Sequence, residues 1–135
     1  MSVRVLADTH AVIWYLFDEE RLSSAGRTAL DNALAAGFPI LVSAISLIEI
    51  VYLEEKRRIG AGATERIRQA CEAENPSIEI VAVDARVAYS LREIARADVP
   101  DMPDRIIAAT AISLGVPLVT RDGKIRASGV QTIQA

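Results

Sequence analysis

The 135-residue sequence has one cysteine, Cys71, one histidine, His10, and few aromatic residues, which make up 4% of the chain. A single cysteine cannot form a disulfide within the chain, and such scarcity is typical of a protein from a reducing compartment. A single histidine excludes a pair of histidines acting as acid and base, and it excludes a metal site rich in histidine. With so few aromatics, the core must consist mainly of Ala, Val, Ile and Leu.

An excess of positive charge is also missing. The chain has 15 Lys and Arg against 18 Asp and Glu, which gives a formal net charge of −3. A protein that coats nucleic acid depends on a large excess of basic residues, so this class is excluded. A nuclease is not excluded, because a bound cation can stand between carboxylates and a phosphate.

The sequence contains no long uninterrupted hydrophobic run. The apolar residues 3–7 stop at Asp8 and are too few for a signal peptide. Residues 35–53 are hydrophobic, with Glu49 as the only charged residue, but Gly37 and Pro39 interrupt them. We therefore expect no membrane segment and no leader, and a cytoplasmic protein.

Strand-like and helix-like patterns alternate along the chain. This alternation predicts a single α/β domain over residues 1–135, with a mainly parallel sheet covered by helices on both faces. Continuous apolar runs indicate strands buried on both faces, and a period near 3.6 indicates helices. The predicted strands are 3–7, 40–44, 78–83, 116–120 and an edge strand at 130–133; the predicted helices are 10–17, 24–36, 46–58, 63–74, 85–97 and 104–114.

Acidic residues fall where the predicted strands end. Asp8 ends the first strand, Glu49 lies just after the second, and Asp122 follows the strand at 116–120, while Asp104 begins the preceding helix. Ligands bind beyond the carboxyl ends of parallel strands, so these carboxylates are predicted to meet at one edge of the sheet. Four carboxylates without histidine or cysteine are the ligand set of Mg²⁺ or Mn²⁺ rather than of zinc or copper.

Each of these acids also has an ordinary structural interpretation, because such residues cap helices and form turns. Jointly, those roles leave the convergence on one edge unexplained. Two carboxylates about 4 Å apart repel by roughly 4 kcal/mol at an effective dielectric constant of about 20, so a cation among them is the simplest solution. The structural roles are a helix cap for Asp8, a capping box for Ser46 and Glu49, a helix N-terminus for Asp101 or Asp104, and a turn for Asp122 and Gly123.

Four blocks of sequence carry a family resemblance: LADTHAVIW at 6–14, SLIEI at 46–50, DMPDRIIAATA at 101–111 and PLVTRDGKI at 117–125. With these blocks the chain resembles the PIN-domain family and, within it, the VapC-type toxins of bacterial toxin–antitoxin pairs. The resemblance covers nearly the whole chain. It implies a three-layer α/β/α fold around a parallel sheet and a ribonuclease that depends on Mg²⁺ or Mn²⁺.

The resemblance also implies which residues form the site. The family's acidic quartet maps onto Asp8, Glu49, Asp104 and Asp122 as metal and catalytic residues, and an accompanying hydroxyl maps onto Thr120. Asp8 and Asp104 would hold a cation, while Glu49 or Asp122 would orient the water, hold a second ion or accept a proton. Because the chain has no histidine pair, attack by water is favoured over attack by the RNA 2′-hydroxyl, which predicts 5′-phosphate and 3′-hydroxyl products.

Basic residues near the acids are candidates for contact with RNA. Arg121 and Lys124 flank Asp122 and are predicted to bind the substrate backbone, and Arg105 either does so or pairs with a neighbouring acid. The basic residues around Gly60 are interpreted as the solvated face of a helical hairpin. The family's partners are a cognate antitoxin and a second copy of the toxin in a homodimer, which helix 10–17 or the hairpin at 46–74 would contact.

Three other functions remain as alternatives. A housekeeping RNA-processing nuclease would use the same site. A receiver-like phosphoacceptor domain would account for Thr120 and Lys124, but the first strand lacks an acidic pair and the central strand lacks a phosphoacceptor Asp. A non-catalytic α/β binding module would not need all four acids.

Overall fold

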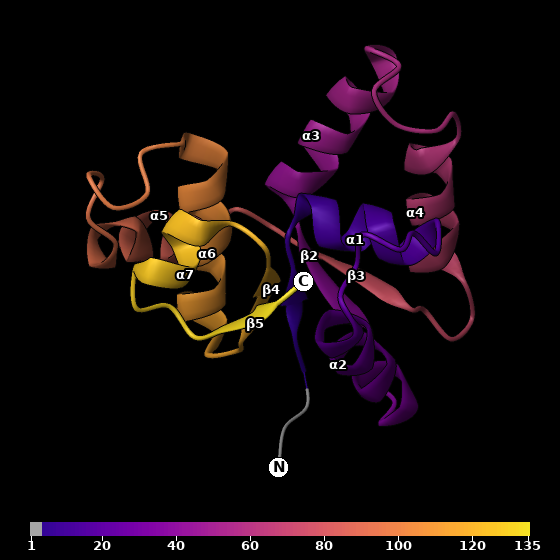
Figure 1. The fold of residues 1–135 in the computed structure, drawn as a ribbon, viewed down its shortest axis with the longest axis horizontal. Helices are drawn as coiled ribbons and strands as arrows, with labels where there is room; N and C mark the ends of the chain where they lie inside the picture. The colour runs from indigo at the N-terminus through magenta and orange to yellow at the C-terminus, as the bar shows by residue number, and fades with distance from the viewer. Residues whose placement is uncertain (1–3) are drawn as a thin grey trace.

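The computed structural model describes residues 4–135, whose five strands form one parallel sheet in the order β3-β2-β1-β4-β5 (Figure 1). Every neighbouring pair of strands is parallel, and the last strand lies at an edge. The predicted α/β class with a parallel sheet is therefore confirmed. The strands are β1 (Leu6–Ala7), β2 (Ile40–Ser43), β3 (Ile78–Val81), β4 (Leu118–Thr120) and β5 (Thr132–Gln134).

Helices cover both faces of the sheet, which gives the three layers that the resemblance implied (Figure 1). Helices α1 to α4 pack on one face, and α5 to α7 pack on the other. None of the helices in residues 4–135 is both long and apolar enough to cross a membrane. The helices are α1 (Thr9–Leu16), α2 (Ser24–Ala35), α3 (Ala44–Glu55), α4 (Ala63–Glu72), α5 (Ala85–Ser90), the 3₁₀ turn η1 (Leu91–Glu93), α6 (Met102–Leu114) and α7 (Gly123–Ala127).

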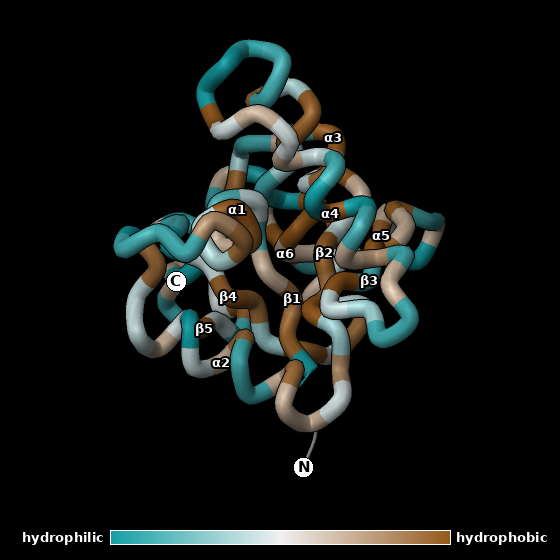
Figure 2. The backbone as a smooth tube through the Cα atoms, turned by 90° about the vertical axis from the view of Figure 1, so that its right-hand side faces the viewer, coloured by the Kyte–Doolittle hydropathy of each residue, from teal (hydrophilic) through white to brown (hydrophobic). Residues whose placement is uncertain are grey.

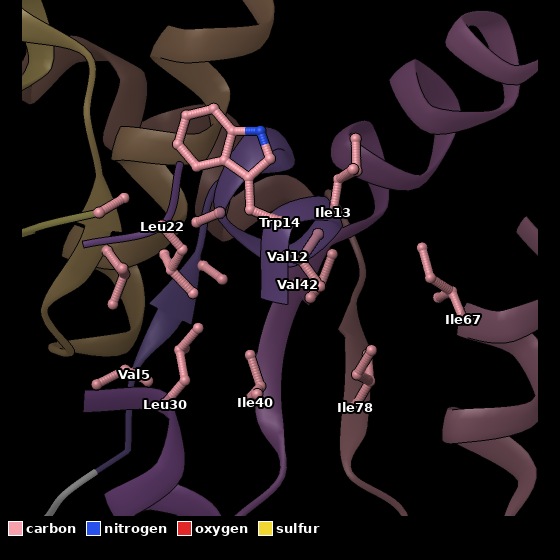
Figure 3. Close-up of a cluster of buried hydrophobic side chains, with 14 of the residues drawn as sticks. Val5, Val12, Ile13, Trp14, Leu22, Leu30, Ile40, Val42, Ile67 and Ile78 are labelled. Carbon is pink, nitrogen blue, oxygen red and sulfur yellow. The ribbon is translucent and has the colours of Figure 1, made fainter. Parts of the chain in front are cut away.

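Two hydrophobic clusters, one on each face, hold the layers together. Figure 3 shows Ile40 and Val42 of β2 on the face that also carries Leu30 and Ile67, whereas Leu41 belongs to the opposite cluster. Strands with a core on both sides are apolar at consecutive positions, as Figure 2 shows for the brown centre of the molecule. Full burial of each such side chain contributes about 1.5–3 kcal/mol.

The junction between β2 and α3 differs from the prediction. Helix α3 begins at Ala44, two residues before the predicted start, and the Ser43 side chain caps it by accepting a hydrogen bond from the Ile45 amide. Strand and helix therefore join without a loop. The predicted capping box of Ser46 with Glu49 is wrong, because Ser46 already lies inside the helix and is fully buried.

The end of α5 also differs. The predicted helix at 85–97 stops at Ser90 and continues only as η1, because the carbonyl oxygens of Leu91 and Ile94 accept hydrogen bonds from the Arg105 guanidinium of α6. The Leu91 carbonyl oxygen also accepts from the Ile94 amide, so the contact with α6 takes the place of a helical hydrogen bond at Ile94 alone.

Two further boundaries were predicted differently. Asp122 was placed in a turn with Gly123, but its carboxylate caps the short helix α7. The first strand was predicted from Val3, which lies outside the described residues; the structure has this strand at Leu6–Ala7. The placement of the acids at strand and helix ends is unaffected by these differences.

Candidate active site

Asp8 follows β1 directly and serves both as a helix cap and as part of a polar cluster. Its Oδ1 accepts a hydrogen bond from the Ala11 amide at 2.9 Å, and its Oδ2 accepts one from the Thr120 hydroxyl at 2.5 Å. Burial raises the pKa of the Asp8 carboxyl, and these two hydrogen bonds oppose the rise. The cap and the candidate site residue are therefore one and the same side chain.

Thr120, at the end of β4, connects two of the predicted acidic residues, through the carboxylate of Asp8 and the backbone amide of Asp122. Its hydroxyl donates to Asp8 and accepts a hydrogen bond from the Asp122 amide at 3.0 Å. The side chain is fully buried. Asp122 in turn caps α7, with Oδ1 accepting from the Ile125 amide at 2.9 Å. One buried hydroxyl thus fixes the spacing between β1 and the start of α7.

Asp104 lies in the first turn of α6, where Asp101 caps the helix by accepting a hydrogen bond from the Asp104 amide at 3.0 Å. Burial, and after it the negative charges of Asp101, Asp122, Glu49 and Asp8, together raise the pKa of Asp104 to about 7. The structure therefore brings all four predicted acids into one electrostatic cluster. Asp101, a secondary candidate in the sequence, belongs to it as well.

Glu49 lies in the second turn of α3. The sequence analysis missed that Thr9 holds its carboxylate and that Ser46 contacts Thr9 in turn. The Thr9 hydroxyl donates to Glu49 Oε1 at 2.6 Å and lies 3.0 Å from Ser46 Oγ. Both hydroxyl residues are buried. The only signals in the sequence are that Thr9 follows Asp8 directly and that Ser46 precedes Glu49 by one helical turn.

The chemistry of this cluster fits a hard divalent cation, because its donors are carboxylate and hydroxyl oxygens. None of the ion pairs within residues 4–135 joins a Lys or Arg to the four acids. In the same range, no group of three or more Asp, Glu, His or Cys side chains is arranged so that it could hold a metal ion as it stands. The acids therefore lie near one another without surrounding a common point, and their side chains would have to move closer to bind a cation.

A cavity of about 540 Å³ opens beside the cluster. Asp101, Asp104 and Asp122 line it, together with Lys124 from the start of α7. Of the three basic residues predicted to bind substrate, Lys124 is therefore the one that the structure places in a cavity with the acids.

The guanidinium groups of the other two have protein partners. Arg105 donates to the carbonyl oxygens of Leu91 and Ile94. Arg121 donates to the Ala135 carbonyl oxygen at 3.2 Å and stacks over the Trp14 ring. Neither of these contacts involves the acidic cluster.

A second cavity, of about 470 Å³, lies on the Glu49 side of the cluster and is mainly apolar. Three of its residues expose more than half of their surface: Ile48 (53%), Tyr52 (59%) and Met102 (65%). The basic residues Lys56 and Arg58 also line it. The other lining residues are Thr9, His10, Ile45, Glu49, Leu53 and Pro103.

Comparisons with known proteins agree with this arrangement. The PIN domain family matches residues 5–129. Over 124 residues, the chain is 32% identical to Ribonuclease VapC22 of Mycobacterium tuberculosis, covering 90% of this chain and 89% of that protein. It resembles a toxin–antitoxin complex from Klebsiella pneumoniae with a TM-score of 0.64 and 26% identity, covering 96% of each chain. Its fold also matches that of VapBC2 from Rickettsia felis bound to a promoter DNA fragment, with a TM-score of 0.67, 17% identity, and coverage of 96% of this chain and 98% of that one.

Proposed function

Because the chain belongs to the PIN domain family, we propose that it is a metal-dependent endoribonuclease that hydrolyses RNA phosphodiester bonds and acts as the toxin of a toxin–antitoxin pair. The observation that carries the proposal is the convergence of four carboxylates on the end of the sheet, where burial and then the neighbouring negative charges raise the pKa of Asp104 to about 7. The ribonuclease relative and the toxin–antitoxin neighbour support it.

Asp8 and Asp104, with Glu49 and Asp122, would hold Mg²⁺ or Mn²⁺. When bound, such an ion supplies charge stabilisation on the phosphate oxygens and makes water more acidic. Four ionised carboxylates alone would repel an RNA backbone, so cation binding and substrate binding are expected to be coupled.

The protein's own residues then orient the reactants. The Thr120 hydroxyl fixes the Asp8 carboxylate, and the Thr9 hydroxyl fixes that of Glu49. Glu49 or Asp122 would orient the attacking water and accept its proton. A carboxylate is assigned the role of proton acceptor because the donors of the site are all oxygens and the chain has no second histidine.

Lys124 is the residue that we propose for contact with the RNA backbone, since it shares a cavity with Asp104 and Asp122. Contact by Arg105 or Arg121 remains a prediction from the sequence, because both guanidinium groups donate hydrogen bonds to backbone carbonyls.

The exposed apolar cavity beside Glu49 supports a protein partner. Ile48, Tyr52 and Met102 together form the kind of contiguous apolar surface that marks an interaction site. We propose that a cognate antitoxin covers it and thereby blocks the acidic cluster. We also propose a cytoplasmic location and a homodimer, which sedimentation of the purified chain would test.

The decisive experiment is cleavage of a single-stranded RNA by purified protein with Mg²⁺, Mn²⁺ or EDTA. Asp8→Asn and Asp104→Asn should abolish cleavage, whereas Asp31→Asn, at an exposed position of α2, should not. Mapping of the ends should find 5′-phosphate and 3′-hydroxyl groups. Cleavage that persists in EDTA, or 2′,3′-cyclic phosphate ends, would refute the proposed chemistry.

A further inference from the structure

We infer that Arg121 is a positioning residue: it holds the segment that carries Thr120 and Asp122 against α1, and this role, rather than contact with RNA, determines its effect on cleavage. The inference rests on the proposed function for its effect on cleavage. Its structural basis is independent of that function, because it consists of contacts within the protein.

Arg121 contacts three separate parts of the chain. Its guanidinium carbon lies 4.5 Å from the centroid of the Trp14 ring, on α1. Its Nε donates to the Ala135 carbonyl oxygen at 3.2 Å, and one terminal nitrogen donates to the Arg21 carbonyl oxygen. A planar guanidinium can stack and donate along its edges at the same time, which a lysine ammonium cannot do.

The partners of Arg121 are themselves fixed. Trp14 is only 8% exposed and Ala135 is fully buried. The Ala135 amide donates to the Thr120 carbonyl oxygen at 3.0 Å. On its other side Ala135 touches Gly26, where a Cβ atom would lie only 3.0 Å from the Ala135 Cα. Arg121 is thus anchored to a well-packed part of the molecule.

The position of Arg121 in the chain explains its effect on the site. In extended backbone, neighbouring side chains point in opposite directions. Thr120 and Asp122 contribute to the acidic cluster, while Arg121, between them, contacts Trp14 and Ala135. Helix α1 therefore holds the segment at two points, through Asp8 on Thr120 and through Trp14 on Arg121.

Two attachment points fix both the distance and the orientation of the segment relative to α1. Removal of the Arg121 contact would leave the segment held at its start, by the pairing of β4 with β1 and by the Asp8–Thr120 hydrogen bond, but would free the part that leads to Asp122 from its contact with Trp14. A displacement of about 1 Å in catalytic groups can reduce a rate by about a hundredfold. We therefore expect Arg121 to affect kcat and metal affinity rather than RNA affinity.

The test compares Arg121→Gln and Arg121→Lys with Arg126→Gln, which removes an exposed basic residue from α7. Both Arg121 variants should lower kcat by roughly ten- to a hundredfold and weaken Mn²⁺ binding by about tenfold, with KM for RNA within about twofold of the wild type. Arg126→Gln should leave kcat and Mn²⁺ affinity unchanged.

A second readout does not depend on cleavage. Trp14 is the only tryptophan of the chain, so its fluorescence reports on the cations over its ring, which are Arg121 at 4.5 Å and Arg21 at 5.5 Å from the centroid. Emission should change in both Arg121 variants and stay unchanged in Arg126→Gln. If Arg121→Gln does not fold, Arg121→Lys provides both readouts. Trp14→Phe, which removes the fluorophore, provides the kinetic readout, with a smaller loss of kcat expected.

The outcomes separate this inference from the proposed function. A raised KM with unchanged kcat, restored by Arg121→Lys, would show that Arg121 binds RNA and would overturn the inference. Unchanged kcat, KM and Mn²⁺ affinity in both variants would overturn it as well. If the wild type itself neither binds Mn²⁺ nor cleaves RNA, the proposed function fails, and unchanged Trp14 emission in both variants would then also overturn the contact on which the inference rests.

Discussion

The two halves of the acidic cluster are built in different ways. In the strand half, formed by Asp8, Thr120 and Asp122, each carboxylate accepts a backbone amide hydrogen bond, and a buried hydroxyl joins the two. In the helix half, formed by Glu49 and Asp104, Glu49 accepts one hydroxyl hydrogen bond, and the pKa of Asp104 is raised by burial and by neighbouring negative charges.

This difference indicates that the two halves of the cluster are positioned by different interactions. The strand half is held in place by hydrogen bonds that exist before any ligand arrives, so its geometry is largely preorganised. In the helix half, Asp104 is buried beside other negative charges, and a bound cation would compensate both effects. Hydrogen bonding therefore positions one side of the site, and charge compensation is expected to position the other.

Among changes to the two halves, removal of the charge at Asp104 should have the largest effect on RNA cleavage. Loss of a metal ligand removes several kcal/mol of transition-state stabilisation, so Asp104→Asn should reduce RNA cleavage by about a thousandfold. The same variant should unfold at a higher temperature than the wild type in EDTA at pH 8, because it removes a repelled carboxylate. Thermal denaturation measures this, and a lower melting temperature in EDTA would contradict the assignment of Asp104 to the repelled half.

The strand half can be weakened by removing a single hydroxyl. Thr120→Val leaves Asp8 Oδ2 and the Asp122 amide without their shared partner, which should lower the free energy of unfolding by about 1–3 kcal/mol and cleavage by roughly ten- to a hundredfold. Thr110 provides the matched control, because it is equally buried but donates only to the Ile106 carbonyl within α6. Thr110→Val should leave cleavage unchanged, and denaturant titration measures both losses of stability.

The helix half predicts a dependence of stability on pH in metal-free protein. The pKa of Asp104 is raised from its ordinary 3.8 to about 7 in the folded state. Between these values the unfolded chain has released this proton and the folded chain still holds it, so the free energy of unfolding should fall as the pH rises. Urea titrations from pH 4 to pH 8 in EDTA should show a steeper fall for the wild type than for Asp104→Asn. Equal slopes would show that the pKa of Asp104 is not raised in the folded state.

The smallest effect on cleavage is expected from Lys124, which lines the cavity beside Asp104 and Asp122. Lys124→Gln should raise KM for RNA a few-fold and reduce the slope of log affinity against log salt concentration by about one. It should leave kcat unchanged, in contrast to the Arg121 variants. RNA binding would be measured over a series of salt concentrations on Asp104→Asn protein, which is expected not to cleave, with and without Lys124→Gln. An unchanged slope would exclude contact between Lys124 and a phosphate.

The sequence predicted the parts of the site that depend on local structure. Asp8, Asp104 and Asp122 lie at strand and helix ends, and such ends can be recognised from short apolar runs and capping residues. For Asp8 and Asp122 the structural role as a cap and the place in the cluster are compatible, because a carboxylate has two oxygens and a cap uses only one.

The parts that the sequence did not reveal depend on contacts between distant segments. The Thr9–Glu49 hydrogen bond joins residues 40 positions apart, and the early end of α5 depends on Arg105 of another helix. The choice of Ser43 rather than Ser46 as the cap of α3 depends on where the sheet stops pairing. Patterns within a short window contain no information about such contacts.

The pairing of β1 with β4 has a consequence for the order of events during synthesis. Asp8 and Thr120 are 112 residues apart, and the central strand has its final neighbour only when Leu118 reaches Leu6. Sheets with such long-range pairing form late and slowly. Asp8 therefore emerges from the ribosome long before its hydrogen-bonding partner Thr120 has been synthesised. The nascent chain cannot cut RNA until almost all of it has been translated.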